Sequence, residues 1–436
     1  MVKQSFLDRK RMPQTGKHIK LKIGEPKLLK LDNGLKVYVI EDNTIEFSRM
    51  DFVFSAGTSF QTKSLVAEST LNLLSEGTTT ITSVDIANKL DYLGSIFDSN
   101  ITKDKASITV YLLNKFIPEI LPLIGDLIQN PIFPEEEISN YLTRKKNQFE
   151  TNYQKVKYRS MLEFTKLVFG ANSPYGGIKK VEDFNNVSRD DIISYYSSYY
   201  NIKNGYIVLS GKITNTTIEL LNKYIGTITL SESTTRKLDF GVNAFGSETY
   251  DYIKIKDSLQ SAIRIGKPII SKHHQDYNSL VVLNTVLGGF FGSRLMSNIR
   301  EDKGFTYGIN SFIINYLNSS YWCIATEVNA KNTNAAIVEI KSELQRLKNE
   351  LISHEELNLV KNYIYGTYLR SFDGPIAQTD RFRAANDLNL DYSYYLNSLE
   401  SMLSQTPETL IKTANRHLNF NSMIKLVVGQ LENDKF

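Results

Sequence analysis

The sequence contains few of the side chains that most often perform catalysis or bind metals. It has five histidines and a single cysteine, Cys323. One cysteine allows neither an intrachain disulfide nor a Cys-based zinc site. The adjacent pair His273 and His274 lacks the spacing of two ligands on one helix face, and no GxSxG motif indicates a serine nucleophile. Taken alone, these residues indicate no catalytic site.

The charge and glycine patterns argue against several classes of ligand. Lys and Arg number 51 against 47 Asp and Glu, a net charge of +4, which does not predict nucleic-acid binding. The spacing of Gly288, Gly289 and Gly292 matches neither GxGxxG nor GxxxxGK[ST], so nucleotide binding is not indicated. No apolar run approaches the roughly 18 residues of a membrane span. Because residues 1–22 are basic and polar, we expect a cytoplasmic protein as written, or a periplasmic one if a signal peptide has been removed.

An internal repeat gives the first indication of the architecture. Residues 187–211 and 405–429 both read as a capped helix followed by an apolar strand that ends in glycine. Residues 133–138 and 352–357 each open a long helical pattern. The two pairs have nearly the same separation, half of the chain, which indicates a duplicated domain.

The coarse pattern of elements predicts an α+β fold. Asp32-Asn33-Gly34 between two apolar runs is a hairpin signal. Alternating strands and long helical patterns, such as 135–153, recur in both halves. We therefore expect two homologous domains, each a mostly antiparallel sheet with helices packed on one face. Polar composition and poor periodicity place the boundaries at 1–232, a linker at 233–248, and a second domain at 249–436.

Three motifs resemble the insulinase, pitrilysin and mitochondrial processing peptidase superfamily. They are Leu31-Asp-Asn-Gly-Leu-Lys-Val37, Pro174-Tyr-Gly-Gly177, and the segment from Leu287-Gly-Gly-Phe-Phe-Gly-Ser-Arg-Leu295 through Asn298-Ile-Arg-Glu-Asp-Lys-Gly-Phe-Thr-Tyr-Gly308. The last is the most specific. The resemblance extends over nearly the whole chain and implies the processing-peptidase-like metallohydrolase fold.

The resemblance also shows what this chain lacks. Active members hold zinc with HxxEH on a helix of the first half, where two histidines one turn apart bind the metal and the glutamate polarises water. That motif falls on residues 68–72 of this sequence, where Glu68 and Asn72 replace the histidines and Leu71 replaces the glutamate. The family's third ligand would fall near Gln148 or Phe149. We therefore expect a degenerate site without metal in this chain.

A second family feature is retained. In two-chain members one subunit carries HxxEH and the other an Arg and a Tyr, which Arg300 and Tyr307 match. The pattern predicts a helix end at 299–303, a stop at Gly304 and a strand from Phe305. Such a turn could bring both side chains to one carbonyl group, where a phenol donates to an oxyanion and a guanidinium anchors the substrate. The alternative is that Arg300 pairs with an acid such as Asp302 and Tyr307 fills a strand position.

Further substrate contacts follow from the same resemblance. Residues 50–59 correspond to the family's edge strand, which pairs with extended substrate, so Phe54, Ser55, Ala56 and Gly57 are candidate substrate-binding residues. A plain internal strand is the alternative. Gly288 and Gly289 are candidates beside the Arg.

These expectations combine into one hypothesis. The chain would be a non-catalytic subunit of a heterodimeric zinc peptidase, supplying Arg300 and Tyr307 in trans to a zinc-bearing HxxEH partner that hydrolyses peptides. It would not be a zinc peptidase alone. Two alternatives remain open: a structural or assembly subunit like the core proteins of respiratory complexes, and a homodimeric peptide-binding protein without catalysis.

Overall fold

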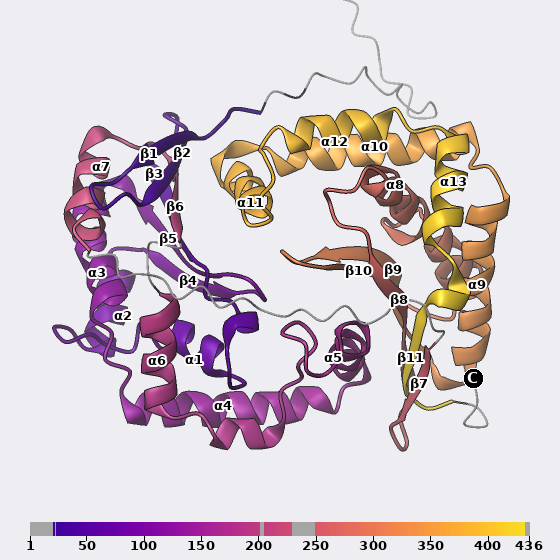
Figure 1. The fold of residues 1–436 in the computed structure, drawn as a ribbon, viewed down its shortest axis with the longest axis horizontal. Helices are drawn as coiled ribbons and strands as arrows, with labels where there is room; N and C mark the ends of the chain where they lie inside the picture. Colours follow the sequence, from indigo (N-terminus) through magenta and orange to yellow (C-terminus); the bar gives the residue numbers. More distant parts are fainter. Residues whose placement is uncertain (1–20, 22, 201–204, 229–248, 432–436) are drawn as a thin grey trace, which may run out of the picture.

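Two β-sheets, one from each half of the chain, form the framework of the molecule (Figure 1). The computed structural model describes residues 21, 23–200, 205–228 and 249–431. The first sheet has the strand order β1-β2-β6-β3-β5-β4. Its strands are β1 Lys27–Lys30, β2 Lys36–Glu41, β3 Phe47–Phe54, β4 Ile96–Ile101, β5 Ala106–Leu113 and β6 Tyr206–Gly211.

The second sheet repeats the first with one strand fewer. Its order is β7-β11-β8-β10-β9, and it matches the first sheet from β2 to β4. In both sheets the first of these pairs is parallel, β2 with β6 and β7 with β11, and the others are antiparallel. The strands are β7 Thr249–Lys254, β8 Gln260–Ile269, β9 Ile309–Asn315, β10 Ser320–Asn329 and β11 Ile424–Gly429.

The repeat expected from the sequence is confirmed down to single residues. Strands β6 and β11 end at Gly211 and Gly429, which both have positive φ, 110° and 142°. A Cβ at Gly211 would lie 2.2 Å from the carbonyl oxygen of Phe47, and a Cβ at Gly429 would lie 2.6 Å from the carbonyl oxygen of Gln260. Only glycine lets the end of this central strand approach its neighbour so closely in both sheets.

The helices of the first half cover one face of its sheet and enclose an apolar core. Helix α4 has the bounds predicted from its pattern, and Gly34 at φ 85° forms the predicted turn between β1 and β2. The helices are η1 Thr58–Phe60, α1 Val66–Asn72, α2 Ser83–Tyr92, η2 Asn114–Phe116, α3 Ile117–Gln129, α4 Glu135–Tyr153, α5 Val156–Phe169, η3 Val181–Asn185, α6 Arg189–Tyr199, α7 Asn215–Leu221 and η5 Asn222–Gly226.

The second half has an equivalent helical layer and its own core. Long helices again follow the strands, so the α+β class with two homologous domains is confirmed. The helices are α8 Tyr277–Gly288, η6 Met296–Asp302, η7 Ala330–Asn332, α9 Thr333–Asn349, α10 His354–Ser371, α11 Gly374–Asn386, α12 Tyr394–Leu403, α13 Pro407–His417 and η8 Phe420–Ser422.

The predicted linker at 233–248 lies outside the described residues, as does the boundary at residue 232. The described helices include none that is long and apolar enough to cross a membrane.

Each half also places one helix on the sheet of the other half. Helix α5 of the first half packs on β8 and β11, and α11 of the second half packs on β2 and β6 (Figure 1). Phe164 and Val168 of α5 join a buried cluster with Cys323 and Leu426, while Phe382 of α11 joins another cluster on the first sheet. The two helices occupy equivalent places in the repeat. The halves are therefore joined by a reciprocal exchange of helices.

A buried ionic cluster fixes one side of this exchange. Asp51 on β3 is 0% exposed and accepts hydrogen bonds from Arg49 (2.8 Å), Arg383 of α11 (2.7 Å) and Thr109 (2.6 Å). Arg49 also pairs with Asp380 at 2.8 Å. Asp51 thus pairs with two guanidinium groups, and it is the buried one of the two carboxylates that compensate Arg49.

Asp51→Asn should therefore destabilise the protein strongly. Removing one partner of a buried ion pair leaves uncompensated charge and typically costs about 3–5 kcal/mol. The measurement is urea unfolding followed by circular dichroism. Asp380→Asn is the control, because Asp380 is 64% exposed and its pair should contribute about 1 kcal/mol or less. Similar losses in both variants would contradict this account of the interface.

Candidate functional site

The three residues at the positions of the HxxEH motif lie together on helix α1. Leu71 is buried in the core of the first half, so it offers no group to a metal or to water. The Asn72 side chain donates to the Glu68 backbone oxygen at 2.8 Å and accepts from Ser99 of β4 at 3.3 Å. These contacts hold the amide within the protein structure.

Glu68 is surrounded by ammonium groups. Its carboxylate forms an ion pair with Lys179, and Lys145 of α4 lies 3.6 Å away. Burial, and then the charge of Glu68, raises the pKa of Tyr141. The pKa of Lys103 is lowered to about 8 by burial and then by the charge of Lys179. Lysines here compensate the carboxylate, a role that a divalent cation plays in an intact HxxEH site.

The positions expected for the family's third zinc ligand carry an amide, Gln148, and an aromatic ring, Phe149. Phe149 belongs to a small aromatic cluster with Tyr153, Tyr158 and Phe184. Two other residues of α4 lie toward Glu68: Lys145, one helical turn before Phe149, and Tyr141, one turn earlier still.

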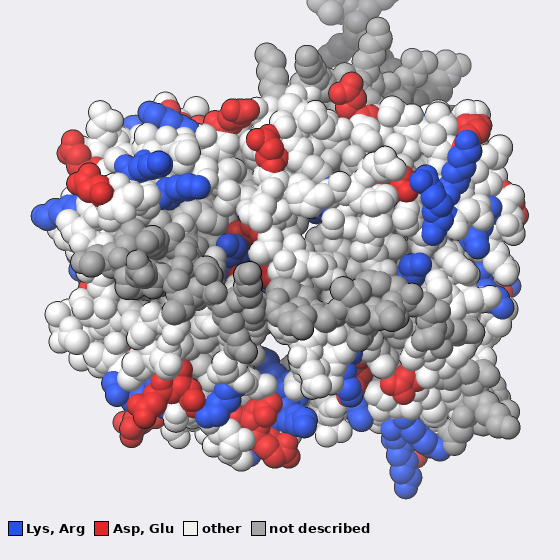
Figure 2. Space-filling model, viewed as in Figure 1, with Lys and Arg blue, Asp and Glu red and all other residues white. Residues whose placement is uncertain are grey.

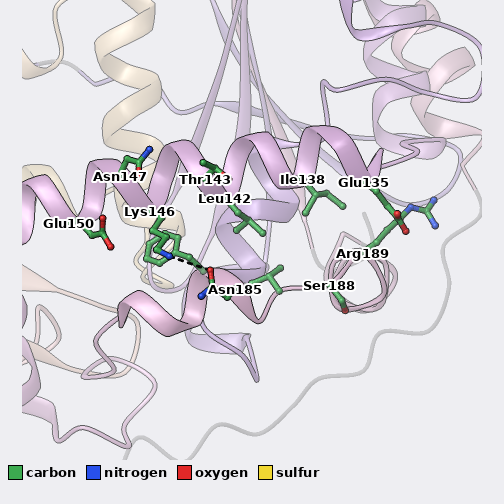
Figure 3. A pocket seen from close by; sticks show the side chains of 13 residues that line it. Glu135, Ile138, Leu142, Thr143, Lys146, Asn147, Glu150, Asn185, Ser188 and Arg189 are labelled. Carbon is green, nitrogen blue, oxygen red and sulfur yellow. Dashed lines mark hydrogen bonds between the residues drawn. The ribbon is translucent and has the colours of Figure 1, made fainter.

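The carboxylate nearest to that expected position, Glu150, lines a separate groove. The groove, of about 790 Å³, runs between α4 and the segment from η3 to α6 (Figure 3). Within it Lys146 donates to Asn185 at 3.5 Å.

The donor set of this site does not fit zinc. A catalytic zinc needs three protein ligands among His, Cys, Asp and Glu. Across residues 21, 23–200, 205–228 and 249–431, no three such side chains are grouped closely enough to hold a metal ion. At the motif itself the one carboxylate is paired with lysine, and the other two positions carry an amide and an alkyl group.

Arg300 and Tyr307 line one cavity of about 1230 Å³. Arg300 lies in η6, a π-helical segment, and Gly304 with φ 64° ends it, as the pattern predicted. The Arg300 guanidinium stacks over the Phe291 ring at 4.6 Å, and no carboxylate in the described chain pairs with it. Tyr307 is 94% exposed just before β9. The alternative, an Arg300–Asp302 pair with Tyr307 in a strand, is not what the structure shows.

The first residues of α5 connect this cavity with the degenerate site. Val156 and Lys157 line the cavity. Next to them in α5, the pKa of Tyr158 is raised by burial and then by the charge of Glu68. The start of α5 thus lines the cavity of Arg300 and also experiences the charge of Glu68.

The remainder of segment 287–308, which carries the family-like motif, supports η6. Arg294 makes a two-bonded ion pair with Glu356 of α10, both contacts at 2.8 Å. Asn298 donates to Glu339 and Glu343 of α9. These contacts fix the segment that carries Arg300 on the helical layer behind it.

Gly288 and Gly289 have a clear packing role. A Cβ at Gly288 would lie 2.7 Å from the Ser311 nitrogen, and one at Gly289 would lie 2.7 Å from the Thr285 Cα. Gly288 lets the end of α8 approach β9, and Gly289 lets the chain turn closely against the last turn of α8. Their predicted contact with substrate stays a prediction.

The prediction of an edge strand at residues 50–59 is wrong. Strand β3 is internal, paired with β6 on one side and β5 on the other. Phe54 and Ala56 are buried, Ser55 accepts from Lys105 at 3.0 Å, and the Gly57 carbonyl accepts from Tyr195 at 2.8 Å. Residues 54–57 thus offer no free strand edge.

The edge strand beside α1 is β4, which pairs with β5 alone in the described part of the sheet. Its Ser99 contacts Asn72. Local sequence does not reveal whether a strand is internal, because that depends on distant partners, here β5 and β6.

Comparisons with known proteins find similar sequences and similar folds. The profile of insulinase (peptidase family M16) matches residues 36–167, and that of the peptidase M16 inactive domain matches residues 186–364. An uncharacterized zinc protease, YmxG, of Bacillus subtilis is 22% identical over 80% of this chain and 85% of its own length. A non-peptidase homolog, YmxG, of Helicobacter pylori is 22% identical over 92% of this chain and 94% of its own. The crystal structure of a peptidase M16 inactive domain from Pseudomonas fluorescens superposes with a TM-score of 0.85 at 21% identity, covering 94% of this chain and all of that one.

We expect the purified chain to bind far less than one zinc ion per molecule. The reason is the donor set at Glu68, Leu71 and Asn72. The measurement is metal analysis by mass spectrometry after incubation with zinc and desalting, with an HxxEH-bearing family member as positive control. One tightly held zinc per chain, lost in Glu68→Gln, would contradict this description of the site.

Arg294→Lys should destabilise the protein by about 1–3 kcal/mol, because lysine cannot make the forked pair with Glu356. Arg294 is 9% exposed, which makes the pair strong. Arg346→Lys is the matched control, since Arg346 is 46% exposed and its pairs should contribute less than about 1 kcal/mol. Thermal and urea unfolding measure the loss of stability in both variants. Equal losses would show that Arg294 does not anchor η6.

Proposed function

The chain belongs to the M16 superfamily of peptidases, and we propose that it is the non-catalytic subunit of a heterodimeric zinc peptidase. The observation that carries the proposal is the contrast between its two sites. The positions of the zinc ligands hold a lysine–carboxylate cluster, whereas Arg300 and Tyr307 remain together and accessible in one cavity.

The reaction would then depend on a partner that bears HxxEH and zinc. In that arrangement the metal and the activated water belong to the partner. This chain contributes hydrogen-bond donors and a surface for the peptide. The B. subtilis and H. pylori relatives carry opposite descriptions, zinc protease and non-peptidase homolog, so the assignment rests on the residues of this chain.

Tyr307 is suited to act on the transition state. Its hydroxyl group is exposed at the cavity and could donate a hydrogen bond to the oxyanion that forms when water attacks a peptide carbonyl. Such a donor is worth most where the charge develops, so its loss lowers the turnover number more than it weakens binding.

Arg300 is suited to hold the peptide. Its guanidinium is positioned by stacking on the Phe291 ring. It has no carboxylate partner within the described residues that would compete with a ligand. It can therefore make a forked contact with a peptide carbonyl or carboxylate. In place of residues 54–57, the backbone edge of β4 is the candidate for pairing with extended peptide.

A second candidate function is a subunit that binds or assembles without taking part in catalysis. The contacts of Arg294, Asn298, Gly288 and Gly289 favour it, because they explain most of segment 287–308 as support for the fold. They do not explain the exposed phenol of Tyr307. The two candidates differ in the effect of removing that hydroxyl.

In the complex with its native peptidase partner, Tyr307→Phe should lower the turnover number about a hundredfold while the subunits stay associated. Tyr92→Phe is the control, since Tyr92 is a similarly exposed tyrosine on α2. Peptide cleavage and size-exclusion chromatography are the measurements. The chain alone should cleave nothing. Full activity of a complex carrying both Arg300→Ala and Tyr307→Phe would overturn the proposed function in favour of the second candidate.

A further inference from the structure

The cavity that holds Arg300 and Tyr307 has a marked imbalance of charge. Four of its lining residues are cations and one is an anion. The cations are Lys155, Lys157, Arg300 and Lys331, and the anion is Glu327. The whole chain has nearly equal numbers of basic and acidic residues, so this imbalance is local to the cavity.

The single carboxylate of the cavity is already paired with one of its cations. Glu327 forms an ion pair with Lys157 at 3.2 Å. Lys155 donates to the neutral Asn152 amide at 2.8 Å, and Arg300 stacks on an aromatic ring. No ion pair of Lys331 occurs in the described chain. Three cations of the cavity therefore have no carboxylate partner there.

The positions of these cations make the excess charge costly for the protein itself. Lys155 and Lys157 flank the start of α5, and Lys331 lies just before α9, two helices whose first turns contain no acidic residue. A helix N-terminus carries partial positive charge, so basic side chains there are unfavourable until an anion arrives. Both halves contribute to this surface, since α5 belongs to the first and α9 to the second.

The cavity also has apolar wall area suited to a peptide. Val156, Leu259 and Phe305 line it, and Leu259 is 83% exposed. Basic side chains are visible beside the opening between the two halves in the space-filling view (Figure 2). Exposed apolar groups among unpaired cations fit a ligand with both carboxylates and side-chain carbon, rather than a small inorganic anion.

We propose that this cavity selects acidic peptide segments, with Lys155, Lys331 and Arg300 contacting Asp or Glu side chains on the peptide. The inference rests on the proposed function in that it takes a peptide as the ligand of Arg300 and Tyr307. It adds the class of peptide and assigns a selecting role to two lysines that lie outside the Arg/Tyr pair.

The test compares matched peptides on the full chain. Calorimetry measures binding of a short Glu-rich peptide, the same peptide with Gln for Glu, and one with Lys for Glu. The acidic peptide should bind about tenfold more tightly than the Gln peptide at low ionic strength, and the difference should shrink as salt rises from about 0.05 to 0.3 M. The Lys peptide should bind least.

Variants locate the effect. Lys155→Gln with Lys331→Gln should reduce the preference for Glu over Gln severalfold. Lys36→Gln with Lys412→Gln removes the same charge, one exposed lysine from each half, outside the cavity and should leave the preference unchanged. Equal loss in both double variants would overturn the proposal, as would equal binding of the Glu and Gln peptides. Tighter binding of a single-stranded nucleic acid than of the acidic peptide would also overturn it.

The outcome can be separated from that of the proposed function. If Tyr307→Phe lowers turnover of the complex but the Glu peptide gains nothing over the Gln peptide, the acidic preference is wrong and the subunit role stands. If the preference for Glu depends on Lys155 and Lys331 while Tyr307→Phe leaves the turnover number of the complex unchanged, the selective cavity is supported. The proposed contribution of Tyr307 to catalysis is then wrong.

Discussion

The fold depends on one packing constraint: each sheet has two apolar faces and its own half covers only one of them. Helices α5 and α11 solve this by crossing to the opposite sheet, where Phe164 and Phe382 enter buried clusters. The Asp51 cluster adds a charge-paired link on the α11 side. Because the start of α5 also lines the cavity of Arg300, the crossing that stabilises the molecule is what brings residues of both halves to one surface.

The degenerate site illustrates how charge balance can be kept when a metal site is lost. A carboxylate left in a partly enclosed site needs a compensating cation. Lys179 and Lys145 provide that charge to Glu68, and Leu71 replaces a polar position with an alkyl group of the core. Helix α1 packs against α4 and β4, so the degenerate site lies beside the β4 edge.

Much of the fold could be predicted from the sequence, because its signals are local or periodic. Such signals predict the hairpin at Asp32-Asn33-Gly34, helix α4, and the glycines that end β6 and β11. The exchange of α5 and α11 could not be predicted, since an amphipathic helix does not reveal which sheet it covers. For the same reason β3 was misplaced at an edge.

The candidate site likewise combines features that the sequence predicts with features that only the three-dimensional structure reveals. The loss of HxxEH was visible in residue types, whereas the lysines that compensate Glu68 were not. Lys145 comes from α4 and Lys179 from the loop after Tyr175, and no spacing rule links either to α1. Their ammonium groups are identified by three-dimensional proximity alone. The charge excess of the cavity is likewise assembled from three separate segments, which carry Lys155 and Lys157, Arg300, and Lys331.

The exchange of helices has a consequence for biosynthesis. A ribosome completes the first sheet well before it reaches residues 374–386, so Ile40, Val53 and Val208 stay exposed to water until α11 is made. Contacts between segments so far apart in the chain also form slowly. During synthesis the first half therefore exposes an apolar sheet face, which makes it prone to aggregation and proteolysis. The exposure ends when α11, in the last quarter of the chain, is synthesised and packs on that face.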